Sequence, residues 1–189
     1  PNGAAAEEIA ARYIEMRPRS SLTDVFLDLA TDVHFRLPAL RLAEAQSRHA
    51  RVFSYVLSWR VPFLGGTLGA PHALEIPFLF GTHERPRMAF FLGAGADRAV
   101  LSARMQAIWT AFARSGDPSI DGFAWPAFDR AERATGVIDD ELGVLRPAWP
   151  SEVEALKPVW RELYAVDRID TRGGGAHPSI PPPQLRLEP

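Results

Sequence analysis

The sequence predicts an α/β fold, a mostly parallel β-sheet flanked by helices, that is incomplete on its own. Residues 51–59 are nearly continuous in β-branched and aromatic side chains, a pattern typical of a strand buried on both faces inside a parallel sheet. Other segments repeat apolar residues at helical spacing, as helices that cover a sheet do. Because only this strand is apolar on both faces, we expect its parallel neighbours to lie outside the chain and apolar patches to be exposed without them.

The residues before this strand predict three helices. The first covers residues 4–16, and the second is a short helix over residues 23–30. Asp32 has the position of an N-cap for a third helix, which runs to about His49 and restarts or bends at Pro38. We expect a capping role alone for Asp32, in preference to support of a functional residue. The side chains expected to face inward are Ile9, Tyr13, Met16, Val25, Phe26 and Leu29.

A histidine in a Gly/Pro turn follows the strand. His72 ends the segment Gly69-Ala70-Pro71-His72, with Glu75 three residues later and an apolar run, residues 76–80, behind it. An imidazole takes up and releases protons near neutral pH, and catalytic groups are often mounted on loops fixed by a rigid scaffold. The turn therefore makes His72 a candidate general base. On spacing alone, a surface or hydrogen-bonding histidine is the commoner case.

Four apolar side chains near His72 in the sequence are candidates for the wall of a substrate pocket, with plain core packing as the alternative: Trp59, Phe63, Leu64 and Leu68. The pair Gly65-Gly66 between them indicates a flexible loop beside the site. Residues 83–85, His-Glu-Arg, are expected to form a solvated loop.

The clearest helix is predicted at residues 97–115. Its apolar stripe indicates core packing, and Gly116 with Pro118 should end it. Residues 134–138 and 143–146 then predict two short strands joined by an acidic turn. The residues expected to form the stripe are Leu101, Met105, Ile108, Trp109 and Phe112.

Ser151 and Glu154 have the spacing of a capping box that opens a last helix. The composition then shifts to Gly-Gly-Gly and Pro-Pro-Pro. We therefore expect one domain over residues 1–165 and an irregular Gly/Pro-rich tail over residues 166–189. The side chains of the last helix expected to face inward are Leu156, Val159, Trp160 and Leu163.

Four segments resemble, in order and spacing, the type-B carboxylesterase family, the group that includes the cholinesterases. The histidine segment reads HALEIPFLFG, at residues 72–81. Before it, residues 31–38 read TDVHFRLP and residues 52–59 read VFSYVLSW. After it, residues 105–118 read MQAIWTAFARSGDP and are followed by Trp125-Pro126. The resemblance extends over about residues 8 to 165.

The resemblance implies the C-terminal part of an α/β-hydrolase fold and a carboxylic ester hydrolase that works through an acyl-enzyme. His72 would be the histidine of a Ser-His-acid triad, and Glu75 would support the site through hydrogen bonds. The serine of such enzymes sits in a Gly-x-Ser-x-Gly turn, and no such turn occurs in the sequence. The N-terminal portion of the same enzyme is therefore the expected partner, carrying the serine, the acid and the oxyanion hole, and a small ester is the expected substrate. A non-catalytic adhesion or binding protein on the same fold is the alternative.

Composition narrows the remaining possibilities. A net charge of −2 gives no basic surface for nucleic acid, and no apolar run reaches the length of a membrane span. No metal or other cofactor is expected, because the histidines at 34, 49, 72 and 83 show no ligand spacing. The lack of cysteine leaves the compartment open between cytoplasm and exterior. Arginine greatly exceeds lysine, which occurs only at position 157 and suggests a GC-rich bacterial genome.

Overall fold

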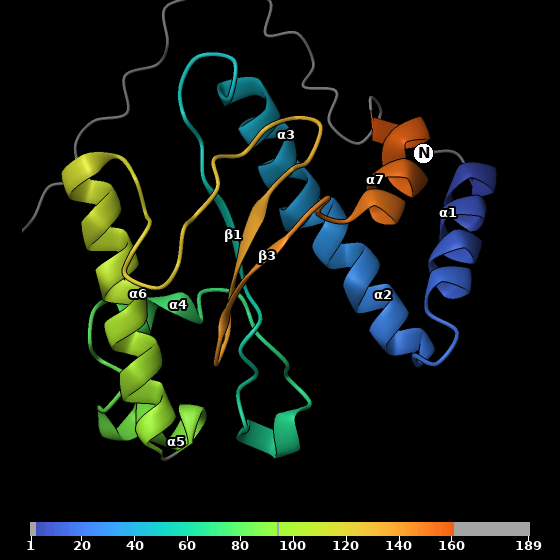
Figure 1. Cartoon of the computed structure of the whole chain (residues 1–189). Coiled ribbons are helices and arrows are strands. Elements are labelled where there is room, and N and C mark those ends of the chain that lie inside the picture. Colours follow the sequence, from blue (N-terminus) through green and yellow to red (C-terminus); the bar gives the residue numbers. More distant parts are fainter. Residues whose placement is uncertain (1–2, 94, 161–189) are drawn as a thin grey trace, which may run out of the picture.

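The computed structural model describes residues 3–93 and 95–160 of the chain. A small central sheet lies between α6 with α4 and α5 on one side and the α2–α3 helices with α1 and α7 on the other (Figure 1). The predicted tail, residues 166–189, and Leu163 lie outside the described residues. The helices are α1 (Gly3–Met16), α2 (Leu22–Thr31), η1 (Asp32–Arg36), α3 (Leu37–Gln46), η2 (Phe63–Gly66), α4 (Glu75–Leu79), α5 (Pro86–Leu92), α6 (Ala96–Ser115), α7 (Pro150–Leu156) and η3 (Lys157–Val159).

The sheet has the strand order β1-β2-β3, formed by β1 (Ser54–Leu57), β2 (Thr135–Ile138) and β3 (Leu142–Leu145). β1 runs parallel to β2, with Ser54 opposite Thr135, and β2 and β3 are antiparallel. The hairpin predicted near residues 134–146 is confirmed. The expectation that β1 has no parallel neighbour in this chain is wrong, because β2 fills that place.

β1 is less buried than its sequence predicts. Its four residues are half-buried or exposed, and the Tyr55 side chain is 42% exposed. The reason lies in the pairing: among the described residues, β1 is hydrogen-bonded to β2 along one edge and leaves the other edge open. An apolar strand of this kind is stable at the interior of a sheet, so its open edge is a place for a further strand.

α2, η1 and α3 follow one another without a break, as one long helical segment (Figure 1). The predicted separation into two helices with Asp32 as an N-cap is therefore wrong. Asp32 begins a π-helical turn, in which the Leu37 N–H donates to the Asp32 carbonyl five residues earlier. Pro38 follows directly and lacks an N–H, and its ring would clash with a carbonyl one α-helical turn before it. A wider turn at this point lets the helix continue through the proline.

Two apolar clusters form the core. One joins α1, the α2–α3 segment and α7, and its central side chains include Tyr13, Leu37, Leu40 and Leu156. The other joins the sheet to α4, α5 and α6 and includes Phe78, Leu101, Met105 and Ile138. Phe26 was expected to face inward but is 66% exposed. Its neighbour Val25, also expected to face inward, is buried at 5% exposure.

The predicted helix at residues 97–115 is confirmed as α6, and Gly116 ends it in the left-handed conformation that glycine favours. The predicted capping box at Ser151 and Glu154 is wrong. α7 begins two residues earlier than this box predicts, at Pro150, with Trp149 as the N-cap residue and no side-chain cap. Proline suits this first helical position because its missing N–H is not needed there.

His83 also departs from its predicted place. The residue was expected in a solvated loop, but it is 7% exposed and its ring stacks on Phe78, with ring centroids 5.8 Å apart. The His83 N–H donates to the Pro77 carbonyl, which folds the chain after α4 back over its own apolar face. Within the described ranges, no helix has the length and apolar character needed to cross a membrane.

Candidate active site

His72 stands at the end of a loop that is closed by its own hydrogen bonds. The Val61 N–H donates to the Gly69 carbonyl at 2.9 Å, and the Arg60 guanidinium donates to the Gly66 carbonyl at 3.0 Å. Val61 is fully buried, so one end of the loop is fixed in the core beside β1. The chain after β1 thus forms a loop whose two ends, Val61 and Gly69, are hydrogen-bonded to each other, and His72 follows directly after this closed loop.

The backbone directly after His72 is in an unfavourable conformation. Ala73 has a φ of 66°, in the left-handed region that residues other than glycine rarely adopt. Leu74 follows, donates its N–H to the Pro71 carbonyl and is buried at 4% exposure. Such strain persists where the surrounding structure enforces it, and it is common at functional sites. Here it turns the chain so that His72 is exposed while the next apolar side chain enters the core.

The His72 ring lies against Phe35, which belongs to the π-helical turn η1. The two ring centroids are 5.1 Å apart and the planes are inclined by 28°, a stacked arrangement. Within the part of the chain that the structure describes, no hydrogen bond is made by the His72 ring. Stacking covers a face of the imidazole and leaves its two nitrogens, which lie at the ring edge, available to other groups.

Glu75 is the first residue of α4 and is half-buried. Burial raises the pKa of the Tyr55 hydroxyl on β1, and the Glu75 carboxylate nearby raises it further. Glu75 therefore lies close enough to β1 to act on Tyr55. Its side chain makes no hydrogen bond to another described residue, so its predicted supporting role stays a prediction.

The four predicted pocket residues are divided between core and surface. Trp59 is 9% exposed and packs edge-to-face on Phe78, at 5.4 Å between centroids. Phe63 is half-buried against Phe90 and Phe91. Leu64 and Leu68 are 64% and 45% exposed. Leu64 and Gly65 depart from helical geometry within η2, which turns these leucines outward.

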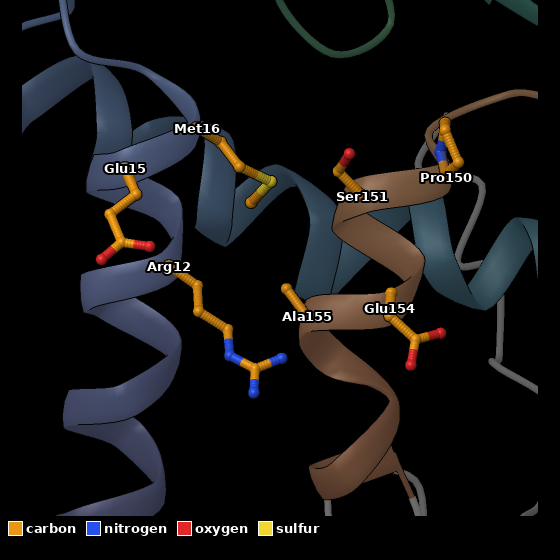
Figure 2. Close-up of a pocket in the computed structure, with 7 residues that line it drawn as sticks. All are labelled: Arg12, Glu15, Met16, Pro150, Ser151, Glu154 and Ala155. Atoms are coloured by element: carbon orange, nitrogen blue, oxygen red, sulfur yellow. The ribbon is translucent and has the colours of Figure 1, made fainter.

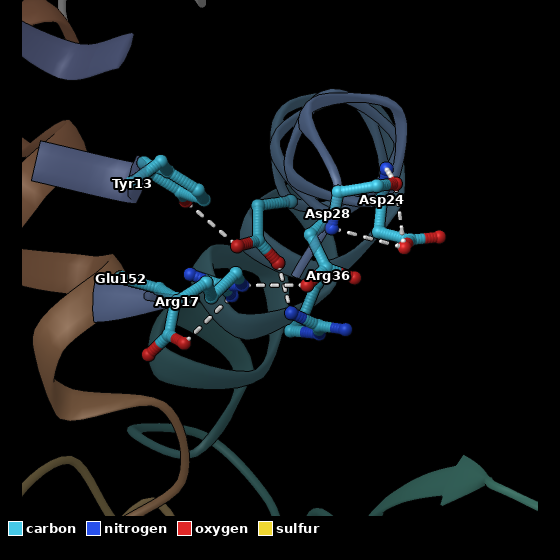
Figure 3. Close-up of polar contacts among 8 residues, drawn as sticks. Tyr13, Arg17, Asp24, Asp28, Arg36 and Glu152 are labelled. Carbon is cyan, nitrogen blue, oxygen red and sulfur yellow. Dashed lines mark hydrogen bonds and ion pairs between the residues drawn. The ribbon is translucent and has the colours of Figure 1, made fainter. Parts of the chain in front are cut away.

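A buried polar network that the sequence did not reveal lies beneath η1. Asp32 is fully buried, accepts a hydrogen bond from the Tyr13 hydroxyl at 2.7 Å and forms an ion pair with Arg36. Both partners, Tyr13 and Arg36, are labelled in Figure 3. Burial raises the pKa of Asp32, while Arg36 and Tyr13 act in the opposite direction. Burial also raises the pKa of Tyr13. The expectation that Asp32 only caps a helix is therefore wrong; an Asp followed four residues later by Arg was the signal for the ion pair.

Arg17 extends this network to α7. Its guanidinium donates to Asp28 of α2 at 2.5 Å and to Glu152 of α7 at 3.0 Å, and it lies over the Tyr13 ring (Figure 3). Arg36 in turn lies 4.6 Å over the ring of Trp149. These contacts connect α1, the α2–α3 segment and α7, and so fix the position of η1.

Two hollows of the surface lie away from His72. A shallow groove of about 510 Å³ runs between α1 and α7, where Arg12 and Met16 face Ala155 (Figure 2). A smaller cleft of about 160 Å³ lies beside β1 and α6, lined by Phe53, Tyr55, Ile108, Trp109, Phe112, Pro118 and Trp125. His72 lines neither of them. No group of three or more His, Asp or Glu side chains placed to hold a metal ion occurs among the described residues.

Comparison with known proteins places these features in context. The model of the carboxylesterase family matches residues 3–145. The para-nitrobenzyl esterase of Bacillus subtilis (strain 168) is 32% identical over 136 residues, which are 72% of this chain and 27% of that protein. The acylcarnitine hydrolase of Rattus norvegicus is 32% identical over 117 residues, 57% of this chain and 20% of that protein. The chain thus spans about a quarter or less of these relatives.

The solved structures give the same picture. The carboxylesterase EST55 of Geobacillus stearothermophilus, at pH 6.2, superposes with a TM-score of 0.68 and 31% identity, over 79% of this chain and 31% of that one. A structure titled PNB esterase superposes with a TM-score of 0.62 and 28% identity, over 78% and 30%. The predicted fold class is confirmed: the chain forms part of an α/β-hydrolase fold.

Proposed function

The chain belongs to the carboxylesterase family, and from this membership we propose that it supplies the catalytic histidine, His72, of a serine esterase that hydrolyses small carboxylic esters. One observation carries the proposal. His72 stands on a strained, exposed turn after a parallel strand, within the residues that match the family, and both ring nitrogens are available at the ring edge.

The chemistry follows from the weak nucleophilicity of a serine hydroxyl, which is hardly ionised at neutral pH. His72 would accept the serine proton while the oxygen attacks the ester carbonyl, and would return it to the departing alcohol. The acyl-enzyme that remains is then attacked by water, whose proton His72 accepts in the same way. The acid product leaves, and the serine recovers its proton. In each step the His72 ring exchanges one proton with an oxygen atom of the serine, the alcohol or the water, at the same position in the site.

The serine, the carboxylate that orients His72 and the oxyanion donors would come from residues outside this sequence, in an N-terminal portion of the same enzyme. The open edge of β1 supports this part of the proposal, since a strand from that portion would complete the parallel sheet there. Glu75 would brace the site from the first turn of α4. The predicted pocket residues Leu64 and Leu68, which are exposed on the neighbouring loop, would face the substrate.

The decisive experiment replaces His72 in the complete enzyme. The variant His72→Ala is expected to lower kcat for a p-nitrophenyl ester by about 10⁴ to 10⁶, the loss known for removal of a triad member, while KM changes far less. His49→Ala is the matched control, because His49 is an exposed histidine in the turn after α3. A His72→Ala enzyme that keeps more than about a tenth of parental kcat would contradict the assignment.

A second measurement tests the need for an N-terminal portion. The 189-residue chain alone is expected to be inert toward p-nitrophenyl esters, since it has no Gly-x-Ser-x-Gly turn. Steady hydrolysis by the purified chain, abolished by His72→Ala, would show that the nucleophile lies within these residues and would overturn this part of the proposal.

A further inference from the structure

Phe35 stacks on the His72 ring although most of its own side chain is open to solvent. It is 53% exposed in the π-helical turn, and its ring centroid lies 5.1 Å from the imidazole centroid. The contact joins two segments that are distant in the sequence. It connects the histidine turn, which follows β1, to the long helical segment that precedes β1.

The turn that carries Phe35 is fixed at both ends. At its start, Asp32 is fully buried and bonded to the Tyr13 hydroxyl. At its end, Arg36 pairs with Asp32 and lies over the ring of Trp149. A π-helical turn inserts an extra residue into the helix and thereby changes the direction in which its side chains point. The buried network thus sets the direction of Phe35 although Phe35 itself is exposed.

The histidine needs such a contact, because its own surroundings leave its ring free to turn. His72 is exposed and its ring makes no hydrogen bond with the residues that the structure describes. A base that exchanges protons in several successive steps must present one nitrogen at one place, and a displacement of about 1 Å can lower the rate about 100-fold. A face-on aromatic neighbour restricts rotation of the imidazole ring without occupying either nitrogen.

We propose that Phe35 is a positioning residue that stacks on His72 and holds the imidazole in the orientation required for proton transfer, an inference that rests on the function proposed above. The buried pair of Asp32 and Arg36 acts one step further back, by fixing the turn from which Phe35 projects. Phe35 touches neither the serine nor the ester in this scheme. Its effect reaches the reaction through the histidine alone.

The test separates kcat from KM in the complete enzyme, with a p-nitrophenyl ester as substrate. Phe35→Ala is expected to lower kcat by about 10- to 100-fold with KM changed less than about threefold, because ring orientation matters to proton transfer and not to ester binding. Phe35→Tyr keeps the aromatic face and should restore kcat to within about threefold of the parent. Phe26→Ala is the control, since Phe26 is 66% exposed on the same helical segment, and it should leave kcat unchanged.

Three kinetic outcomes would overturn the inference. The first is a Phe35→Ala enzyme with kcat within about twofold of the parent, and the second is a Tyr variant as impaired as the Ala variant. The third is a raised KM with unchanged kcat, which would make Phe35 part of the substrate wall. His72→Ala is measured in parallel: if it is inactive while Phe35→Ala is normal, only this inference fails. If His72→Ala is active, the proposed function fails and the inference with it.

A spectroscopic measurement checks the stack without reference to activity. A ring proton above an aromatic face is shifted upfield in the NMR spectrum, so Phe35→Ala should move the His72 ring protons downfield while those of His49 stay in place. Phe35→Tyr should leave the His72 signals close to the parental position. Unmoved His72 signals in a folded Phe35→Ala protein would show that the stack is absent and would overturn the proposal. Melting temperatures identify any variant whose lost rate reflects unfolding, an outcome that would also count against a positioning role.

Discussion

The helical part of the molecule and the part that carries the sheet treat their buried polar groups differently. The helical part comprises α1, the α2–α3 segment and α7, and its fully buried Asp32 is bonded to Tyr13 and paired with Arg36. In the sheet part, which comprises β1–β3 and α4–α6, both ring nitrogens of His83 and the Trp125 Nε1 are buried without a hydrogen-bond partner among the described residues. Among the described residues the helical part has fewer such atoms, at Arg17 Nη1 and Trp160 Nε1.

This difference indicates which part of the fold satisfies its buried polar groups within the described residues. A buried polar atom without a partner costs about 1 to 3 kcal/mol, so the sheet part holds its unpaired groups against a penalty that the helical part avoids at Asp32. The sheet part also has the open edge of β1. His72 therefore belongs to the less complete part, and its ring packs against Phe35 of the more complete one.

The largest effect is expected from breaking the buried network of the helical part. Asp32→Ala removes the shared partner of Tyr13 and Arg36, and breaking a buried charge pair costs roughly 3 to 5 kcal/mol. The free energy of unfolding of the complete enzyme, from urea titration, measures this loss. Tyr13→Phe is the matched variant, because it removes a single hydrogen bond to the carboxylate and should cost about 1.5 to 3 kcal/mol. A loss below 1 kcal/mol in Asp32→Ala would contradict the view that this part depends on its network.

A smaller loss is expected where the sheet part is packed most tightly. Gly136 on β2 lies directly under the indole of Trp125, and a Cβ at this position would overlap the ring atoms Cε2 and Cζ2. Gly136→Ala should therefore cost about 1 to 3 kcal/mol in the free energy of unfolding, through displacement of the indole. Gly143→Ala on β3 is the control, because its Cβ would meet Val137 at an ordinary 3.8 Å. Equal stability of the two variants would show that Trp125 is loosely held.

The features predicted correctly from the sequence are those whose cause is local. The α6 helix has its apolar stripe and its Gly116 within one stretch of chain, and the hairpin of β2 and β3 has its acidic turn between two apolar runs. The features that were missed depend on contacts between distant residues. The hydrogen bond from Tyr13 to Asp32 joins two helices, and the stack of Phe35 on His72 joins residues that precede and follow β1 in the sequence.

The candidate site shows the same division. The sequence predicted the turn at His72, because glycine, proline and the following apolar run are adjacent to it, and the catalytic role of His72 stays a prediction. It placed His83 in solvent, because His-Glu-Arg is a polar string whose burial depends on the chain folding back over Phe78. The strain at Ala73 was also invisible, since nothing in the residue type indicates a left-handed conformation.

At His83, the comparison predicts that a substitution raises the free energy of unfolding instead of lowering it. His83→Phe keeps the stack on Phe78 and removes two buried nitrogens that have no partner among the described residues, so it should raise the free energy of unfolding by about 1 kcal/mol. Thermal unfolding of parent and variant measures the change. A loss of stability instead would mean that His83 is bonded to a group beyond the described residues, and the sheet part would then be better satisfied than it looks here.

The smallest effect concerns a surface aspartate of the sheet part, the counterpart of buried Asp32. Hydrogen bonds from Ser119, and then from Arg51, lower the pKa of Asp117 from 3.8 to about 2. A carboxyl whose pKa is lowered on folding contributes stability above its unfolded pKa and loses it as the pH falls toward about 2, whereas the raised pKa of Asp32 has the opposite sign. The carboxyl carbon of Asp117, followed by NMR between pH 5 and pH 1.5, gives the midpoint directly. Arg51→Ala should move that midpoint part of the way back toward 3.8, because the bonds from Ser119 remain. A midpoint already near 3.8 in the parent protein would mean that the loop after α6 is not held as described, and that the sheet part lacks even this surface contact.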